Sequence, residues 1–141
     1  GARLPRDPGG VGVDAVIQDR AFVEYIKRAS ERATYVLAVC TGASNLASTG
    51  LLDGKRATTN KIKFTKIATA FPAVNWVPRA RWVVDGKLWT SSGVAAGLDM
   101  GHAFIEDQYG AQNASEFARH LEIVPNTDST NDPFVSSITP A

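Results

Sequence analysis

The 141-residue sequence has little of several things that would reveal a function directly. It holds one cysteine and two histidines, and its 15 Lys and Arg nearly balance its 14 Asp and Glu. It has no run of about 18 apolar residues that could span a membrane, and its start, GARLPRDPGG, lacks the apolar region of an export signal.

Each shortage excludes a class of protein. A single cysteine cannot form an intramolecular disulfide, and so few Cys and His ligands disfavour a structural zinc site. A net charge of +1 supplies no strong field for nucleic acid or an anionic membrane. We therefore expect a cytoplasmic protein whose partner is a small molecule, with no membrane and no nucleic acid.

Length and patterning predict one α/β domain. With 44% hydrophobic residues, the chain can bury one core but is short for two domains. An amphipathic helix starts after Asp19, the uncharged run Tyr35 to Val39 suits a strand buried on both faces, and Asp85-Gly86 predicts a hairpin turn. Later helical patterns complete a layered α/β sheet over residues 1–125, and residues 126–141 are expected to form a polar tail.

The order of elements around Cys40 predicts a nucleophile elbow. A buried strand runs into Cys40, Gly42 follows two positions later, and a helix of small residues continues to about Gly50. In such an elbow, small neighbours let the chain turn sharply and hold the nucleophile at the carboxyl end of the strand. A thiol at a helix N-terminus loses its proton more readily. The N–H of Thr41 and that of Gly10, in the Gly-rich loop at Pro8-Gly9-Gly10, are the candidate oxyanion donors. A plainly buried structural cysteine is the alternative.

Three segments resemble the ThiJ/PfpI superfamily, which is the class I glutamine-amidotransferase-like group. They are Pro8-Gly9-Gly10, AVCTGASNLASTGLLDGKRATTN and DGKLWTSSGVAAGLDM. The Cys-Thr-Gly-Ala and Arg-Ala-Thr-Thr combination is most similar to the isocyanide hydratase branch. The resemblance implies a flavodoxin-like three-layer sandwich with a mostly parallel sheet, homodimers, Cys40 as nucleophile, and the amides of Gly10 and Thr41 around the reacting atom. Gly9, Gly42, Asn60 and Asp99 are expected to support the site.

The sequence departs from the family pattern in two places. Asn60 stands where relatives often carry His, and an amide cannot act as a base at neutral pH. Relatives also have further strands before the position of Pro8, including an acidic residue that contacts the thiol. We therefore expect an N-terminally incomplete sheet in which the Cys40 strand lacks a neighbour and exposes apolar surface.

Other polar residues have a simpler interpretation. His102 and His120 are expected on helix surfaces, and Asp99 is expected to cap a helix or support the site rather than react. The basic residues Lys55, Arg56, Lys61, Lys63 and Lys66 predict a solvated helix face, because no phosphate-binding Gly-rich loop accompanies them.

Three functions remain open. The first is an isocyanide hydratase-like enzyme that needs no cofactor and no metal. The second is a glyoxalase-type lyase or deglycase that acts on small aldehydes with the same thiol. The third is a redox sensor or interaction protein in which Cys40 is oxidised reversibly.

Overall fold

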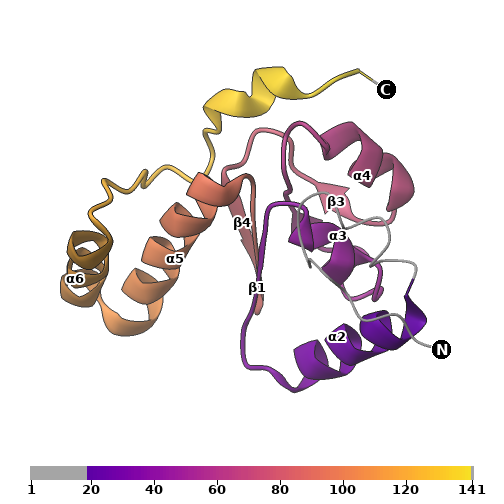
Figure 1. Ribbon diagram of the computed structural model, residues 1–141, viewed down its shortest axis with the longest axis horizontal. Helices are drawn as coiled ribbons and strands as arrows, with labels where there is room; N and C mark the ends of the chain where they lie inside the picture. The colour runs from indigo at the N-terminus through magenta and orange to yellow at the C-terminus, as the bar shows by residue number, and fades with distance from the viewer. Residues whose placement is uncertain (1–18, 141) are drawn as a thin grey trace.

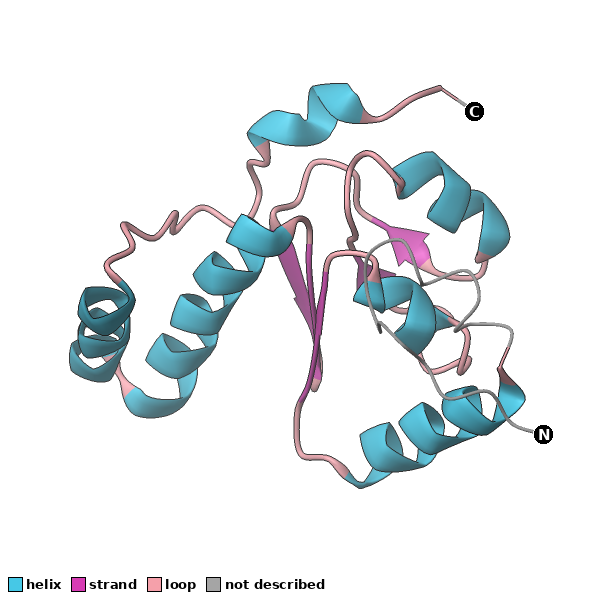
Figure 2. Cartoon of the chain, in the orientation of Figure 1, coloured by secondary structure: helices cyan, strands magenta, loops and turns pink. Residues whose placement is uncertain are grey.

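The computed structural model describes residues 19–140 and shows helices on both sides of a central group of strands (Figure 1). The helices α2, α3 and α4 lie on one side, and α5 and α6 lie on the other (Figures 1 and 2). This arrangement confirms the predicted α/β three-layer organisation. The elements are α2 Arg20–Arg32, β1 Val36–Val39, α3 Gly42–Ala47, β2 Arg56–Ala57, α4 Phe64–Ala70, β3 Asn75–Trp76, β4 Trp82–Asp85, β5 Leu88–Ser91, α5 Val94–Tyr109, α6 Ala111–Leu121 and the 3-10 helix η2 Pro133–Ser137.

Local signals explain several of these boundaries. The Asp19 carboxylate accepts from the amides of Ala21 and Phe22, which caps α2 where the sequence predicts it. Gly86 has φ 59°, and β4 and β5 pair antiparallel on either side of it, so the Asp-Gly hairpin is confirmed.

The strands form two small sheets. The first has the order β1-β5-β4, with β1 parallel to β5 in a register that places Ala38 opposite Thr90. The second holds β2 parallel to β3. Parallel pairing dominates, as expected for a flavodoxin-like fold, and β4 is the antiparallel exception.

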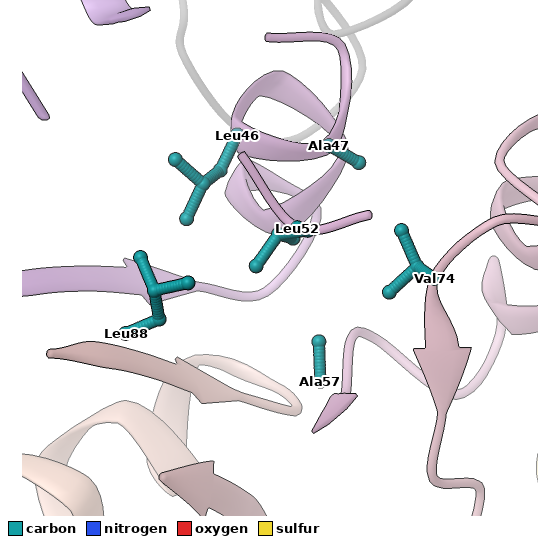
Figure 3. Close-up of a cluster of buried hydrophobic side chains, with 6 residues drawn as sticks. All are labelled: Leu46, Ala47, Leu52, Ala57, Val74 and Leu88. Atoms are coloured by element: carbon teal, nitrogen blue, oxygen red, sulfur yellow. The ribbon is translucent and has the colours of Figure 1, made fainter. Parts of the chain in front are cut away.

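A hydrophobic core lies between the strands and α3. Figure 3 shows its buried side chains, which come from α3, the turn after it, β2, β5 and the stretch before β3: Leu46, Ala47, Leu52, Ala57, Val74 and Leu88. Small residues on α3 let this short helix lie close to the strands, and α3 contacts β1 directly.

β1 is less buried than the sequence predicts. Leu37 and Val39 are 40% and 39% exposed, and within residues 19–140 only β5 pairs with β1. The expectation of burial on both faces is therefore wrong for the described part of the chain, whereas the expected exposure of apolar surface at this strand is confirmed.

One helix differs from its predicted limits. The helix after Cys40 ends at Ala47 rather than near Gly50, and Gly50, with φ 83°, lies in the turns that follow. α6, one of the helices expected in the later part of the sequence, spans Ala111–Leu121. No helix among residues 19–140 is both long and apolar enough to cross a membrane.

Candidate functional site

Cys40 follows β1 immediately and comes two residues before the start of α3. Its backbone conformation is one that residues with a side chain rarely adopt. Its φ is 58°, and within residues 19–140 Glu122 is the only other non-glycine residue with positive φ. A left-handed conformation costs an ordinary residue about 1–2 kcal/mol. Strain of this kind at a strand-to-helix turn is what defines a nucleophile elbow, and it persists only where neighbouring contacts impose it.

Backbone and side-chain bonds hold the elbow on both sides. The Cys40 N–H donates to the Ser91 carbonyl over 3.1 Å, which extends the β1–β5 pairing by one residue. The Cys40 carbonyl accepts from the Thr59 hydroxyl over 2.8 Å. Thr59 is fully buried, and sequence reasoning did not single it out, although it lies inside the Arg-Ala-Thr-Thr segment. The thiol itself is partly exposed and free of a disulfide.

Close approach of α5 supports the same turn. A Cβ placed on Gly97 would lie 2.7 Å from Cγ1 of Val39, the residue before Cys40. Only glycine therefore allows α5 to pack this closely against the end of β1. Gly97 lies in the family-like segment DGKLWTSSGVAAGLDM, but nothing in the sequence indicates this contact.

Of the two expected oxyanion donors, the structure describes Thr41 but not Gly10. Thr41 is buried, and its carbonyl accepts from both the amide and the hydroxyl of Ser44 at the start of α3. Gly42 is the first residue of α3. Gly9 and Gly10 lie outside the described residues, so the two-amide hole stays a prediction.

The expected supporting polar residues have structural partners. The Asn60 side chain accepts from the Lys63 amide over 3.1 Å, just before α4. Asp99 accepts from Arg81 Nε over 2.7 Å and from the Asn126 amide over 2.9 Å. His120 is exposed on α6 beside Glu116, and His102 lies on α5. None of these contacts involves Cys40.

A group of four buried charged residues was missed by the sequence analysis. Lys61, Arg81, Asp99 and Asp132 are each at most 9% exposed, and we call them the charge cluster. Lys61 Nζ lies 3.4 Å from Asp132 Oδ2, and Arg81 bridges Asp99 at 2.7 Å and Asp132 at 3.8 Å. The expectation that Lys61 belongs to a solvated face is wrong, because its whole side chain, the ammonium group included, is buried.

Hydrogen bonds explain how Lys61 is accommodated. Its ammonium group donates to the Thr58 hydroxyl, the Ala80 carbonyl and the Ser92 hydroxyl, with the Thr59 carbonyl at 3.2 Å. Burial nevertheless lowers the pKa of Lys61, and nearby Asp132 opposes that shift.

Asp132 shows the opposite balance. Burial alone would raise its pKa, but the Ser92 hydroxyl, the Phe134 amide and the Lys61 ammonium together hold the pKa below its usual range. Asp132 thereby anchors the segment after Asn126 to the core. The signal that could have found it is the Asp132-Pro133 pair, which is typical of a cap before a helical turn.

A cavity of about 230 Å³ lies beside the charge cluster, at the N-terminus of α5. Asn60 and Ser92 line it, and their chain neighbours Thr59 and Ser91 are the residues that bond Cys40. Ligands of open α/β sheets bind beyond the carboxyl ends of the strands, which is where this cavity lies.

The fold and the elbow define a class: α/β sandwich proteins that hold a cysteine at a strand-to-helix turn. The chain belongs to the DJ-1/PfpI family, whose sequence profile matches residues 8–107.

Individual relatives differ in what their names state. The chain is 34% identical to an isonitrile hydratase of Pseudomonas putida over 84% of this chain and 50% of that protein. It is 36% identical to the HTH-type transcriptional regulator GlxA of Rhizobium meliloti over 68% of this chain and 28% of the regulator. A ThiJ/PfpI family crystal structure from Pseudomonas syringae superposes with a TM-score of 0.73 at 30% identity, covering 84% of this chain and 48% of that one. The chain thus spans half or less of these relatives.

Proposed function

We propose that this protein is a cysteine-dependent enzyme of the isocyanide hydratase type, with Cys40 as its nucleophile. The observation that carries the proposal is the φ of 58° at Cys40, held by Thr59 and Ser91 at the carboxyl end of β1. The 34% identity to an isonitrile hydratase supports the choice of reaction.

The proposed reaction adds one water to the substrate. The Cys40 thiolate forms a bond to the electrophilic carbon of an isocyanide, and that carbon takes up a proton. Water then attacks the same carbon, the carbon–sulfur bond breaks, and an N-substituted formamide leaves with the thiolate restored. The amides of Thr41 and Gly10 would hold the negative charge that develops, and no cofactor or metal takes part.

The cavity at the N-terminus of α5 is the proposed site for the substrate's unreactive substituent. Its lining includes the apolar side chains of Ile62, Val94 and Phe134, all of which are exposed. A neutral, apolar substituent would gain from this contact, and the Lys61 ammonium group behind it is already paired with Asp132 over 3.4 Å.

The test compares the protein with its Cys40→Ala variant on an isocyanide and on methylglyoxal. We expect hydration of the isocyanide by the protein and none by the variant, with both chains equally folded by circular dichroism. Turnover of methylglyoxal alone would favour the glyoxalase-type lyase or deglycase. Equal turnover by both chains would remove Cys40 from the mechanism.

A redox sensor is the second candidate, and the contacts of Asn60, Asp99 and His120 favour it. Each of these side chains makes its hydrogen bond to a group other than Cys40. In a reversible sensor, mild peroxide would transfer one oxygen atom to the Cys40 thiolate and leave as water, giving a sulfenic acid that a thiol can reduce, and the protein would turn over neither substrate. Mass spectrometry after peroxide treatment distinguishes the two functions.

We also propose a homodimer that works in the cytoplasm, where thiols stay reduced. The exposed apolar side chains Leu37, Val39 and Leu98, on β1 and α5, supply surface for such an interface. Light scattering should show more than the 15.1 kDa of one chain, and a monodisperse monomer would contradict the proposal.

A further inference from the structure

A second cavity, which shares no lining residue with the cavity at α5, lies where β2 and β4 meet the segment after Asn126. Its volume is about 340 Å³. Arg56 of β2 and Arg79 of the stretch before β4 lie at its border, and Ser129 and Thr130 come from the segment after Asn126. No proposed role of Cys40 uses this cavity.

The two arginines bring positive charge to the border of the cavity. Both side chains are exposed, and neither guanidinium makes a hydrogen bond or ion pair with any residue in 19–140. No carboxylate lines the cavity. Two carboxylates bond to lining residues: Asp85 accepts from the backbone amide of Arg56 and not from its side chain, and Asp128 accepts from the amide and the hydroxyl of Thr130. Two free guanidinium groups beside one cavity favour an anion with several acceptor oxygens.

The rest of the lining is apolar and fixed in place. Val77, Ala80, Trp82 and Val83 contribute to it, and Trp82 and Val83 are almost fully buried. Such a floor favours a ligand with an apolar body as well as a charge, because it can remove carbon surface from water.

Backbone hydrogen bonds join the walls of the cavity. The Val77 amide donates to the Ala57 carbonyl over 2.8 Å, and the Arg81 amide donates to the Ser129 carbonyl over 2.7 Å. The Asp132 amide donates to the Arg79 carbonyl over 2.9 Å, next to the charge cluster. The backbone that carries Arg79, Ser129 and Thr130 is therefore ordered before any ligand arrives, which lowers the entropic cost of binding.

We propose that this cavity binds a small organic anion, a carboxylate or phosphate ester on an apolar body. The Arg56 and Arg79 guanidinium groups hold the anionic oxygens, and the apolar body lies on Val77 and Val84, which are the lining's more exposed apolar side chains. Binding is noncovalent and independent of the thiol, so the site would persist whether or not the proposed isocyanide chemistry is correct.

The experiment titrates phenyl phosphate and benzoate into the ¹⁵N-labelled protein and follows amide and Trp82 indole resonances, the latter assigned with a Trp82→Phe variant. We expect saturable shifts for at least one anion at residues that line the cavity. Arg56→Gln and Arg79→Gln should each raise Kd by about tenfold or more, since a charge-assisted hydrogen bond contributes that much to binding. Lys55→Gln removes the same charge one residue away, outside the lining, and should change Kd by less than about twofold.

Four outcomes would overturn the proposal. The first is that neither anion gives saturable shifts. The second is that Lys55→Gln weakens binding as much as the arginine variants, which would indicate attraction by the overall positive charge of this surface and not by the two arginines. Alternatively, benzyl alcohol binds as tightly as benzoate, so that charge contributes nothing; or inorganic phosphate binds as tightly as phenyl phosphate, so that the apolar floor contributes nothing. Unchanged Cys40 alkylation rates in every variant confirm that the fold is intact.

Discussion

The elbow at Cys40 and the charge cluster share neighbours but are built in opposite ways. The Thr59 hydroxyl donates to the Cys40 carbonyl, and the Thr59 carbonyl accepts from the Lys61 ammonium group. The Ser91 carbonyl accepts from the Cys40 amide, and the Ser92 hydroxyl accepts from the Lys61 ammonium group. The elbow holds a strained, partly exposed residue beside a strand with exposed apolar side chains. The charge cluster holds buried charges that are paired with one another in ion pairs. The elbow therefore places its backbone strain at the proposed nucleophile, whereas the cluster is a set of buried ion pairs whose disruption should cost stability.

The largest expected effect comes from breaking the cluster at Lys61. Lys61→Met leaves Asp132 buried without its cation, and removing one partner of a buried pair costs about 3–5 kcal/mol. Urea denaturation measures this loss. Lys63→Met, on an exposed neighbour, should change the free energy of unfolding by less than about 0.5 kcal/mol. Equal small effects for both variants would mean that the cluster does not stabilise the fold.

The next effect concerns the packing that holds the elbow. Gly97→Ala puts a methyl group 2.7 Å from Val39 Cγ1, and such overpacking costs about 1–3 kcal/mol. Adding Val39→Ala to Gly97→Ala should recover part of the loss. Gly101→Ala on the same helix meets only ordinary contact with Phe117 at 3.4 Å and should stabilise the protein by up to about 1 kcal/mol. Two variants with the same sign would refute the close approach of α5 to β1.

A smaller effect with an unusual sign is expected at Cys40 itself. Cys40→Gly should be more stable than Cys40→Ala by about 1 kcal/mol, because glycine tolerates a φ of 58°. In β1, by contrast, Ala38→Gly should destabilise the protein by roughly 0.5–1 kcal/mol. Thermal melts of the three variants decide the point, and a less stable Cys40→Gly would show that the elbow is unstrained.

Asp132 of the charge cluster should contribute to the acid dependence of stability. The pKa of Asp132 lies below its ordinary value of 3.8 in the folded chain. Its stabilising contribution is therefore complete above that value and is lost as the pH falls through the lower, folded pKa. The stability difference between the protein and Asp132→Asn should shrink in acid. A difference for Asp132→Asn that is independent of pH would contradict the ion pairing.

Sequence reasoning reached the elbow more easily than the cluster. The run into Cys40, the small residues after it and the hairpin at Asp85-Gly86 are local signals, and local signals predict local geometry. The cluster joins residues separated by as many as 71 positions, from Lys61 to Asp132, so no window of the sequence contains it. Lys61 in particular is surrounded by other lysines that are exposed, and charge alone could not indicate which one is buried.

The exposed face of β1 shows a second limit. An uncharged run such as Tyr35 to Val39 predicts a strand, but its burial depends on neighbours that the run does not encode. Among the described residues β5 is its only partner, which leaves Leu37 and Val39 accessible.

The central claim is that the fold makes Cys40 a reactive nucleophile, and the rate of its alkylation tests this most directly. Iodoacetamide labelling is followed by mass in the native protein and in the same protein unfolded by guanidinium chloride, at one pH and one reagent concentration. Because Cys40 is the only cysteine, every adduct reports on the elbow. We predict faster labelling in the native state. Slower labelling in the native state would mean that the fold buries the thiol as a packing residue, and the nucleophile assignment would be wrong.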